Sequence, residues 1–156
     1  MSERSVTHDT FIIERVYGAS PARVFAAWAD MEAKKRWCGC HEGAQYHLDF
    51  RVGGRETNRG GPPGGPVYRV EGVYHDIVPD QRIVYSYVMY ADDARVSVSL
   101  QTVELLPEGT GTRLVFTEQG AFLDGHDAPA QRAQGTAWGL DRLGEQLARE
   151  ERVGGE

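Results

Sequence analysis

Apolar residues recur at steps of three and four near the C-terminal end of the chain. Between Asp127 and Arg152 they form the stripe Ala133, Ala137, Leu140, Leu143 and Leu147. This is the period of one helical face, so the segment predicts a long amphipathic helix with one buried side. Gly125, Asp127 and Pro129 supply a loop residue, an N-cap candidate and a first-turn proline for its start.

The other face of this predicted helix is polar. Its charged residues fall mostly off the apolar stripe: Arg132, Asp141, Arg142, Glu145, Arg149 and Glu150. At 1.5 Å per residue the helix would be roughly 35 Å long, so only a broad curved sheet could cover its stripe. The rest of the chain should therefore supply that sheet.

The beginning of the chain predicts one strand followed by two short helices. Thr10–Tyr17 is rich in β-branched and aromatic residues, which favour a strand. Ser20-Pro21 then provides an N-cap and a first-turn proline for a helix that reaches Trp28. Asp30 begins a second short helix, which reaches Trp37.

Strand character returns over Tyr46–Arg51 and is interrupted at Gly53-Gly54, where a bulge or a tight turn is expected. The sequence Gly-Gly-Pro-Pro-Gly-Gly-Pro at 60–66 cannot continue a ladder, because proline lacks the backbone donor. This segment is either an ordinary hairpin connection or a mobile flap over the mouth of a pocket.

Turn residues suggest the register of the remaining strands. A hairpin tip at Pro79-Asp80 gives the pairs Tyr74–Tyr85, Gly72–Tyr87 and Val70–Met89. A tip at Asp92-Asp93 gives Met89–Val96, Tyr87–Val98 and Tyr85–Leu100. A three-residue loop at Pro107–Gly109, with Gly109 in the left-handed region, gives Leu100–Phe116, Thr102–Leu114 and Val98–Glu118.

These registers predict an antiparallel sheet that is covered on one side. The helix-facing set is Val70, Tyr74, Tyr85, Tyr87, Met89, Val96, Val98, Leu100, Leu114 and Phe116. The outer set is Arg69, Glu71, His75, Ser86, Ser97, Ser99, Gln101 and Thr117. Because the inner set is rich in aromatic residues and Gly72 leaves space beside them, we expect a cavity between sheet and helix.

Composition and charge argue against several classes of function. The 156 residues fit one domain over 1–156, with a core at about residues 10–150 and short polar tails. No apolar run approaches the roughly 20 residues of a membrane span, and the polar N-terminus has no signal-peptide pattern, so we expect a cytoplasmic protein. The formal net charge of −6 argues against nucleic acid or an anionic membrane as a partner.

The two cysteines, Cys38 and Cys40, are followed by His41. These residues could ligate a soft metal, but a structural zinc site needs a second Cys or His pair, and none follows. We therefore expect no metal here, and no cofactor elsewhere. The simpler interpretation is that Cys38 and Cys40 are two small residues in a glycine-containing loop of a protein in a reducing compartment. Whether Cys38 and Cys40 have any role stays open.

Several segments carry a family resemblance that covers about Thr10 to Leu147. They are Ser20-Pro21 with Val24–Trp28, then Trp37, Asp49–Gly54, Tyr74–Pro79 and Phe116–Gly120. In this order they resemble the AHSA-type (activator of heat-shock ATPase homologue-like) branch of the START-like (SRPBCC) superfamily. The resemblance implies an α+β helix-grip (START-like) fold, in which a curved antiparallel β-sheet wraps around a long C-terminal α-helix. Two short helices would lie between the first two strands.

The chain departs from the family pattern at two places. Cys38 to His41 replaces the aromatic residue and proline that usually follow the family tryptophan. Thr136 stands where many relatives have a tryptophan after the helix glycine, and Trp138 is the candidate to fill that space. The family has no shared set of catalytic residues that can be carried over to this chain.

The superfamily implies three kinds of function. We favour binding of a small, mostly apolar or aromatic molecule, lipid- or polyketide-like, as a carrier or sensor. The expected ligand-binding residues are Trp28, Gly72, Tyr74, Tyr85, Tyr87, Met89, Val98, Leu100, Phe116, Glu118 and Trp138. The alternatives are a cyclase- or hydratase-type enzyme in the same cavity and a chaperone-ATPase-binding stress protein.

An enzyme would need an acid or base on the inner face, and Glu118, Asp76 and Tyr74 are the candidates that the registers offer. Glu118 is the first of these, because a carboxylate on the concave face is costly unless it is paired or wet. The chain has no Gly-x-Ser-x-Gly or phosphate-loop motif, so the enzyme is the less favoured reading. A chaperone partner is also disfavoured, and a homodimer stays open.

Overall fold

The computed structural model describes residues 4–38 and 45–154. In chain order the elements are β1 Val6–Tyr17, α1 Pro21–Ala29, α2 Met31–Trp37, β2 Gln45–Leu48, β3 Arg55–Gly60, β4 Tyr68–Val78, β5 Arg82–Ala91, β6 Ala94–Glu108, β7 Gly111–Leu123 and α3 Pro129–Gly154. Over these residues the strands form one antiparallel sheet in the order β1-β7-β6-β5-β4-β3-β2.

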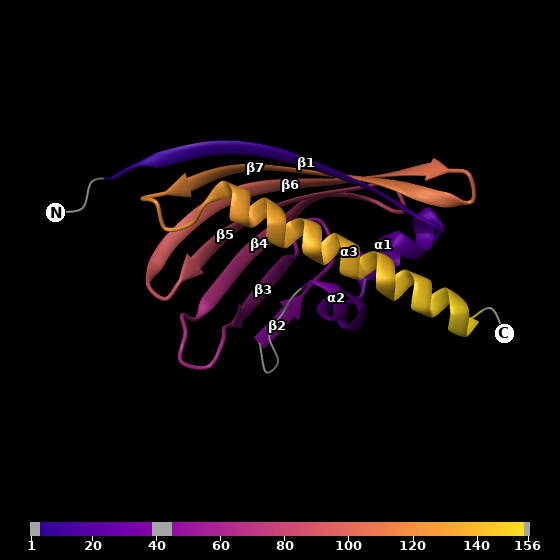
Figure 1. The fold of residues 1–156 in the computed structure, drawn as a ribbon, viewed down its shortest axis with the longest axis horizontal. Coiled ribbons are helices and arrows are strands. Elements are labelled where there is room, and N and C mark those ends of the chain that lie inside the picture. Colours follow the sequence, from indigo (N-terminus) through magenta and orange to yellow (C-terminus); the bar gives the residue numbers. More distant parts are fainter. Residues whose placement is uncertain (1–3, 39–44, 155–156) are drawn as a thin grey trace.

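The long helix α3 lies across the inner face of the curved sheet, and α1 and α2 lie beside it at one end of the sheet (Figure 1). This is the α+β helix-grip arrangement that the sequence predicted. Within the described residues, no helix is both long enough and apolar enough to cross a membrane.

The two short helices begin where the sequence predicted. The Ser20 hydroxyl caps α1 by accepting from the Arg23 amide (3.3 Å), and the Asp30 carboxylate caps α2 by accepting from the Ala33 amide (2.9 Å). Both caps satisfy amides that would otherwise lack a partner in the first helical turn. The Trp37 indole then donates to the Ala27 carbonyl (3.0 Å), so the two helices are held together at one end of the sheet.

The stripe of α3 is buried unevenly along the helix. Leu140, Leu143 and Leu147 are at most 2% exposed, whereas Ala133 and Ala137 are only half-buried. The N-cap prediction for Asp127 was wrong, because the helix begins on the Ala128 carbonyl. The Asp127 carboxylate accepts a hydrogen bond from the Arg132 side chain instead. Because the leucines are buried and the alanines are only half-buried, the C-terminal half of α3 packs on the sheet, and the N-terminal half lies over a cavity.

The register between β4 and β5 is confirmed. Tyr74 lies opposite Tyr85, Gly72 opposite Tyr87 and Val70 opposite Met89. The turn is one residue longer than predicted, with Asp80 in the left-handed region (φ 64°), and a bulge at His75 compensates for the extra residue. Beyond that bulge Asp76 faces outward and pairs with Arg82 (2.6 Å), so the prediction of Asp76 as an inward carboxylate was wrong.

The register between β5 and β6 was wrong by one residue. The tip lies at Asp92-Asp93 as predicted, but a bulge at Val96 shifts the pairs to Met89–Ser97, Tyr87–Ser99 and Tyr85–Gln101. A one-residue slip reverses the faces of a strand. Val98 (43% exposed) and Leu100 (partly exposed) therefore lie on the outer face, and Ser97, Ser99 and Gln101 point inward.

The register between β6 and β7 was also wrong. The turn has two residues, Gly109-Thr110, and the resulting pairs are Val103–Phe116, Leu105–Leu114 and Gln101–Glu118. Gly109 does adopt the predicted left-handed conformation (φ 60°). Leu114 and Phe116 face inward as predicted, because the errors in the two hairpins fall on β6 alone.

Two glycines differ sharply in the space around them. A Cβ on Gly111, at the start of β7, would overlap the Tyr17 carbonyl oxygen, whereas a Cβ on Gly135 of α3 would meet nothing within 4 Å. We expect Gly135→Ala to raise the free energy of unfolding by about 0.5–1 kcal/mol, because alanine restricts the unfolded chain. Gly111→Ala should lower it by about 1–3 kcal/mol. Urea unfolding of the two variants checks the contrast, which equal changes would contradict.

Candidate functional site

A cavity of about 750 Å³ lies between the sheet and the N-terminal half of α3. Its size falls in the range of small-molecule sites, about 300–1,000 Å³. Its aromatic walls include Trp28, Trp37, Tyr85, Tyr87 and Phe116. These rings contact one another, with centroid distances of 4.6 Å for Trp28 and Trp37 and 5.7 Å for Tyr85 and Tyr87. The cavity therefore has clustered aromatic rings on its walls.

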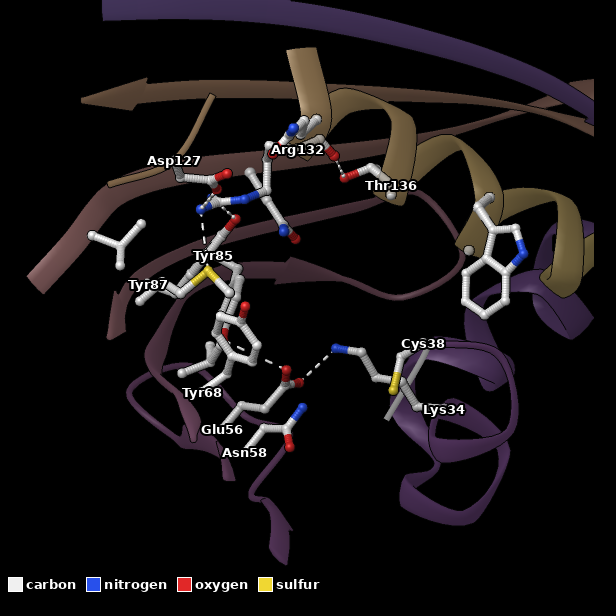
Figure 2. A pocket seen from close by; sticks show the side chains of 18 of the residues that line it. Lys34, Cys38, Glu56, Asn58, Tyr68, Tyr85, Tyr87, Asp127, Arg132 and Thr136 are labelled. Atoms are coloured by element: carbon white, nitrogen blue, oxygen red, sulfur yellow. Dashed lines mark hydrogen bonds and ion pairs between the residues drawn. The ribbon is translucent and has the colours of Figure 1, made fainter. Parts of the chain in front are cut away.

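A buried ion pair lies at the α2 end of the cavity. Lys34 of α2 and Glu56 of β3 both line the cavity, and their side chains are 8% and 9% exposed. The Lys34 ammonium donates to Glu56 Oε1 at 2.5 Å, and the Tyr74 hydroxyl donates to the same oxygen at 2.5 Å. Figure 2 shows Lys34 and Glu56 pointing toward one another from opposite walls.

Aromatic rings surround the Lys34 ammonium. It lies 5.4 Å from the centroid of Trp28, 5.9 Å from that of Tyr74 and 5.7 Å from that of Tyr85. Each ring face attracts a cation at this distance. Burial, and then the Glu56 charge, raises the pKa of Tyr74 and of Tyr85 far above its usual value. Both phenols therefore stay protonated and act as hydrogen-bond donors at neutral pH.

A second buried cluster surrounds Arg132 at the start of α3. Its guanidinium donates to the Tyr87 hydroxyl (2.8 Å), to Ser97 (2.9 Å) and to Asp127 (2.9 Å). Figure 2 shows Arg132 and Asp127 close together, on the side of the cavity opposite Lys34. The Arg132 side chain is only 10% exposed. This residue, which the sequence pattern assigned to the polar face, therefore ties α3 to β5 and β6.

Glu118 of β7 lies beneath this second cluster. It is 1% exposed and accepts hydrogen bonds from the Tyr87 hydroxyl (2.9 Å) and the Gln101 amide (3.1 Å), and it lies 3.5 Å from Arg132. Burial raises the pKa of this carboxyl, although Arg132 and the hydrogen bonds oppose the shift. Glu118 is therefore a paired, buried group, and it is not among the side chains that line the cavity.

The structure brings some of the predicted site residues together and separates others. Those that line the cavity are Trp28, Tyr85, Tyr87, Met89, Phe116 and Trp138. Trp138 is 52% exposed and lies against Arg142, so it sits at the rim and does not fill the interior. Tyr74 packs behind the wall, where it holds Glu56. Val98 and Leu100 were wrongly included, because the bulge at Val96 turns them outward.

Gly72 leaves no empty space, contrary to the prediction. A Cβ at this position would overlap the phenol ring of Tyr85, which already occupies the volume beside the glycine. The glycine instead allows Tyr85 to lie flat against β4. Substituting Gly72 would therefore displace Tyr85 and would not fill the cavity.

Sequence reasoning missed Lys34, Glu56 and Arg132. A signal for Glu56 existed, because it pairs with Gly72, which in turn pairs with the inward residue Tyr87. A predicted pairing of β3 with β4 would therefore have placed the Glu56 carboxylate on the inner face of the sheet. Lys34 and Arg132 gave no such signal, because a charged residue on a short or amphipathic helix is usually solvated.

Cys38 is the C-cap residue of α2 and lines the cavity. It is disulfide-bonded, which corrects the expectation of a reduced thiol at this position. Cys40 and His41 lie outside the described residues, so the absence of a metal at this cluster stays a prediction. The loop after β3 reaches the site through Pro66, which also lines the cavity.

Residues 18–150 match the family model described as "Activator of Hsp90 ATPase homolog 1-like protein" (AHSA1). The chain belongs to this family. Members of this START-like family bind hydrophobic ligands. A comparison with curated proteins found no match.

Solved structures of similar proteins agree with the AHSA1 assignment. The Mll3558 protein from Rhizobium loti is 51% identical, with 90% of this chain and 98% of that chain covered and a TM-score of 0.87. An uncharacterized protein from Rhizobium leguminosarum is 46% identical, with 95% and 99% covered and a TM-score of 0.89. CalU16 from Micromonospora echinospora, at 22% identity, 97% and 88% coverage and a TM-score of 0.60, shares the fold alone.

The buried Lys34–Glu56 pair allows a test by single and double substitution. Lys34→Met leaves the Glu56 carboxylate buried without its cation, so the free energy of unfolding should fall by about 3–5 kcal/mol. Lys34→Met/Glu56→Leu removes both charges and should restore at least half of that loss. Denaturant unfolding of both variants measures the coupling.

A matched control comes from the exposed pair Arg82–Asp76, whose side chains are 50% and 42% exposed. Arg82→Ala should change the free energy of unfolding by less than about 1 kcal/mol. If Lys34→Met were as mild as this control, the ion pair would have no structural importance.

The raised pKa of Glu118 predicts a specific pH dependence. The folded protein holds this proton more tightly than the unfolded chain does. The stabilisation is complete below the pKa of an unfolded glutamate, about 4.3, and is lost as pH rises through the higher folded pKa. Glu118→Gln cannot titrate, so the wild-type free energy of unfolding minus that of the variant should fall as pH rises above about 4. Urea unfolding across that range checks the slope, and a rising difference would contradict it.

Proposed function

We propose that this protein binds a small, mostly apolar or aromatic molecule, lipid- or polyketide-like, in the cavity between the sheet and α3, as a carrier or sensor. The observation that carries the proposal is the 750 Å³ cavity with aromatic walls. Trp28, Tyr85, Tyr87, Met89 and Phe116 offer apolar surface to a bound molecule, and each aromatic ring buries on the order of 150–250 Å². We also propose a cytoplasmic location, and a homodimer stays open.

The pairing of charges around the cavity favours an uncharged ligand. Lys34 is paired with Glu56, and Arg132 is paired with Asp127 and lies close to Glu118. A charged ligand would lose its hydration without gaining an unpaired counter-charge. Such a cavity suits a ligand that has mostly apolar surface and a few polar groups.

A cyclase- or hydratase-type enzyme is the second candidate, and one observation favours it. Glu56, Lys34 and Tyr85 line the cavity and form a group that could accept or donate a proton next to a bound molecule. Glu118 does not line the cavity, so it has no direct contact with a ligand there. Under the enzyme hypothesis, Glu56 is therefore a better candidate for the catalytic base than Glu118. Binding to a chaperone ATPase, which the family description suggests, is the third candidate.

Filling the cavity tests the proposed function. Thr136 lines the cavity and points into it from α3 (Figure 2), whereas Gln134 on the same helix is exposed and lies outside the lining. We expect the neutral fluorescent probe N-phenyl-1-naphthylamine to bind the wild-type protein. Thr136→Trp should weaken this binding roughly tenfold or more, since the new side chain occupies the site. Gln134→Trp should leave the affinity unchanged.

Fluorescence titration measures both affinities, and thermal unfolding confirms that each variant is folded. Equal binding by wild type and Thr136→Trp would show that the probe binds elsewhere. If neither this probe nor a panel of neutral aromatic and lipid-like molecules bound the wild type, the proposed function would be wrong.

A further inference from the structure

The two oxygens of the Glu56 carboxylate are used unequally. Oε1 accepts the short hydrogen bonds from Lys34 and Tyr74. Among the described residues Oε2 accepts one long hydrogen bond, from the Tyr85 hydroxyl at 3.5 Å, and the Tyr46 hydroxyl also lies near this carboxylate. A carboxylate offers about four acceptor positions, and a buried acceptor that stays unfilled is costly. Oε2 therefore has capacity for another donor, at a position where Glu56 lines the cavity.

Hydroxyl groups around this carboxylate are also incompletely used. The Tyr85 hydroxyl is too far from Oε2 for a strong hydrogen bond, since such bonds are usually about 2.7–2.8 Å long. The Tyr46 hydroxyl is buried beside the same carboxylate, and burial and then Glu56 raise the pKa of this phenol, but it has no hydrogen bond of normal length and angle within the described part of the chain. The α2 end of the cavity thus combines an acceptor with unfilled capacity and a donor that is weakly engaged.

The 3.5 Å gap between the Tyr85 hydroxyl and Glu56 Oε2 is suited to one bridging oxygen. A triangle with two sides of about 2.7 Å closes over this base, so one atom can bond to both groups at normal length. That atom must accept the Tyr85 proton and donate its own proton to Glu56. A hydroxyl group does both, whereas an ether or ketone oxygen only accepts.

A charged group fits this position less well. An ammonium group could donate to Glu56, but Lys34 already lies 2.5 Å from the same carboxylate and would repel it. A ligand carboxylate would be repelled by Glu56 itself. A neutral hydroxyl has neither problem, and the surrounding rings of Trp28 and Tyr85 suit an aromatic body next to it.

We propose that Glu56 and Tyr85 form a hydroxyl-binding subsite, and that the ligand of this protein is a neutral phenol or aromatic alcohol. Lys34 and Tyr74 position the carboxylate by filling Oε1, which leaves Oε2 for the ligand. This inference rests on the proposed function and specifies its ligand class.

Matched naphthalene derivatives test the subsite in the intact protein. Isothermal titration calorimetry near neutral pH would compare 2-naphthol, 2-methoxynaphthalene and 2-naphthoate. The wild type should prefer 2-naphthol over the methoxy compound by roughly tenfold or more, because a hydrogen bond to a charged group is lost in the ether. 2-Naphthoate should bind most weakly.

Variants then locate the origin of that preference. Tyr85→Phe removes the bridging donor and should reduce the ratio of the two affinities severalfold. Lys34→Met/Glu56→Leu removes the acceptor together with its counter-ion and should abolish the ratio. Tyr90→Phe changes a phenol that lies against Arg69 and outside the cavity lining, so it should preserve the ratio. Thermal unfolding of each variant shows that it is folded, and Tyr85→Phe retains the test if the double variant is unstable.

The outcomes separate this inference from the proposed function. Equal binding of 2-naphthol and 2-methoxynaphthalene by the wild type would overturn the hydroxyl subsite while supporting the cavity. A preference that survives both Tyr85→Phe and the double substitution would also overturn it, since the hydroxyl would then be recognised elsewhere. Absence of binding by all three compounds would overturn the proposed function and this inference with it.

Discussion

Lys34 and Arg132 place two positive charges inside the molecule, and both must be neutralised there. An isolated buried charge costs far more than the net stability of a domain allows. Glu56 pairs with Lys34, and Asp127 pairs with Arg132 above the buried carboxylate of Glu118. These pairs join α2 and α3 to the sheet, so the elements on either side of the cavity are held by polar contacts.

The cavity follows from the way α3 divides its packing. The C-terminal half of α3 buries Leu140, Leu143 and Leu147 against the sheet. Its N-terminal half lines the cavity with the small residues Gly135, Thr136 and Gly139, which leave the volume next to them unfilled. Two roles are thereby separated along one helix: the leucines stabilise the fold, and the small residues leave the cavity open.

Membership of the AHSA1 family accounts for the fold and not for the particular chemistry of this cavity. The chemistry of the cavity depends on the side chains that this chain places on the inner face of the sheet. The unequal use of the two Glu56 oxygens is one example, since it depends on the relative positions of α2, β3, β4 and β5.

Periodicity and capping residues determined the elements of this protein from its sequence alone. The helical period of the leucine stripe, the caps Ser20 and Asp30 and the tips at Pro79-Asp80 and Asp92-Asp93 act over a few neighbouring residues, and they predicted α1, α2, α3 and two hairpins. The same patterns predicted an antiparallel sheet that is covered on one side by the long helix, and the family resemblance implied the helix-grip fold. The aromatic residues Tyr85, Tyr87 and Phe116 were also placed correctly, because an alternating pattern records which face of a strand is apolar.

Only the tertiary structure decided how the buried polar groups pair. The alternation of β6 predicted Val98 and Leu100 on the inner face, but the bulge at Val96 turned Ser97 and Gln101 inward. There they bond to Arg132 and Glu118, which lie on other elements far away in the sequence. The partners of a buried charge are set by proximity in space, and a one-residue bulge is enough to reverse which side chains of a strand face inward. For this physical reason the aromatic walls of the cavity could be predicted from local patterns, whereas the burial of Lys34 and Arg132 and their pairing could not.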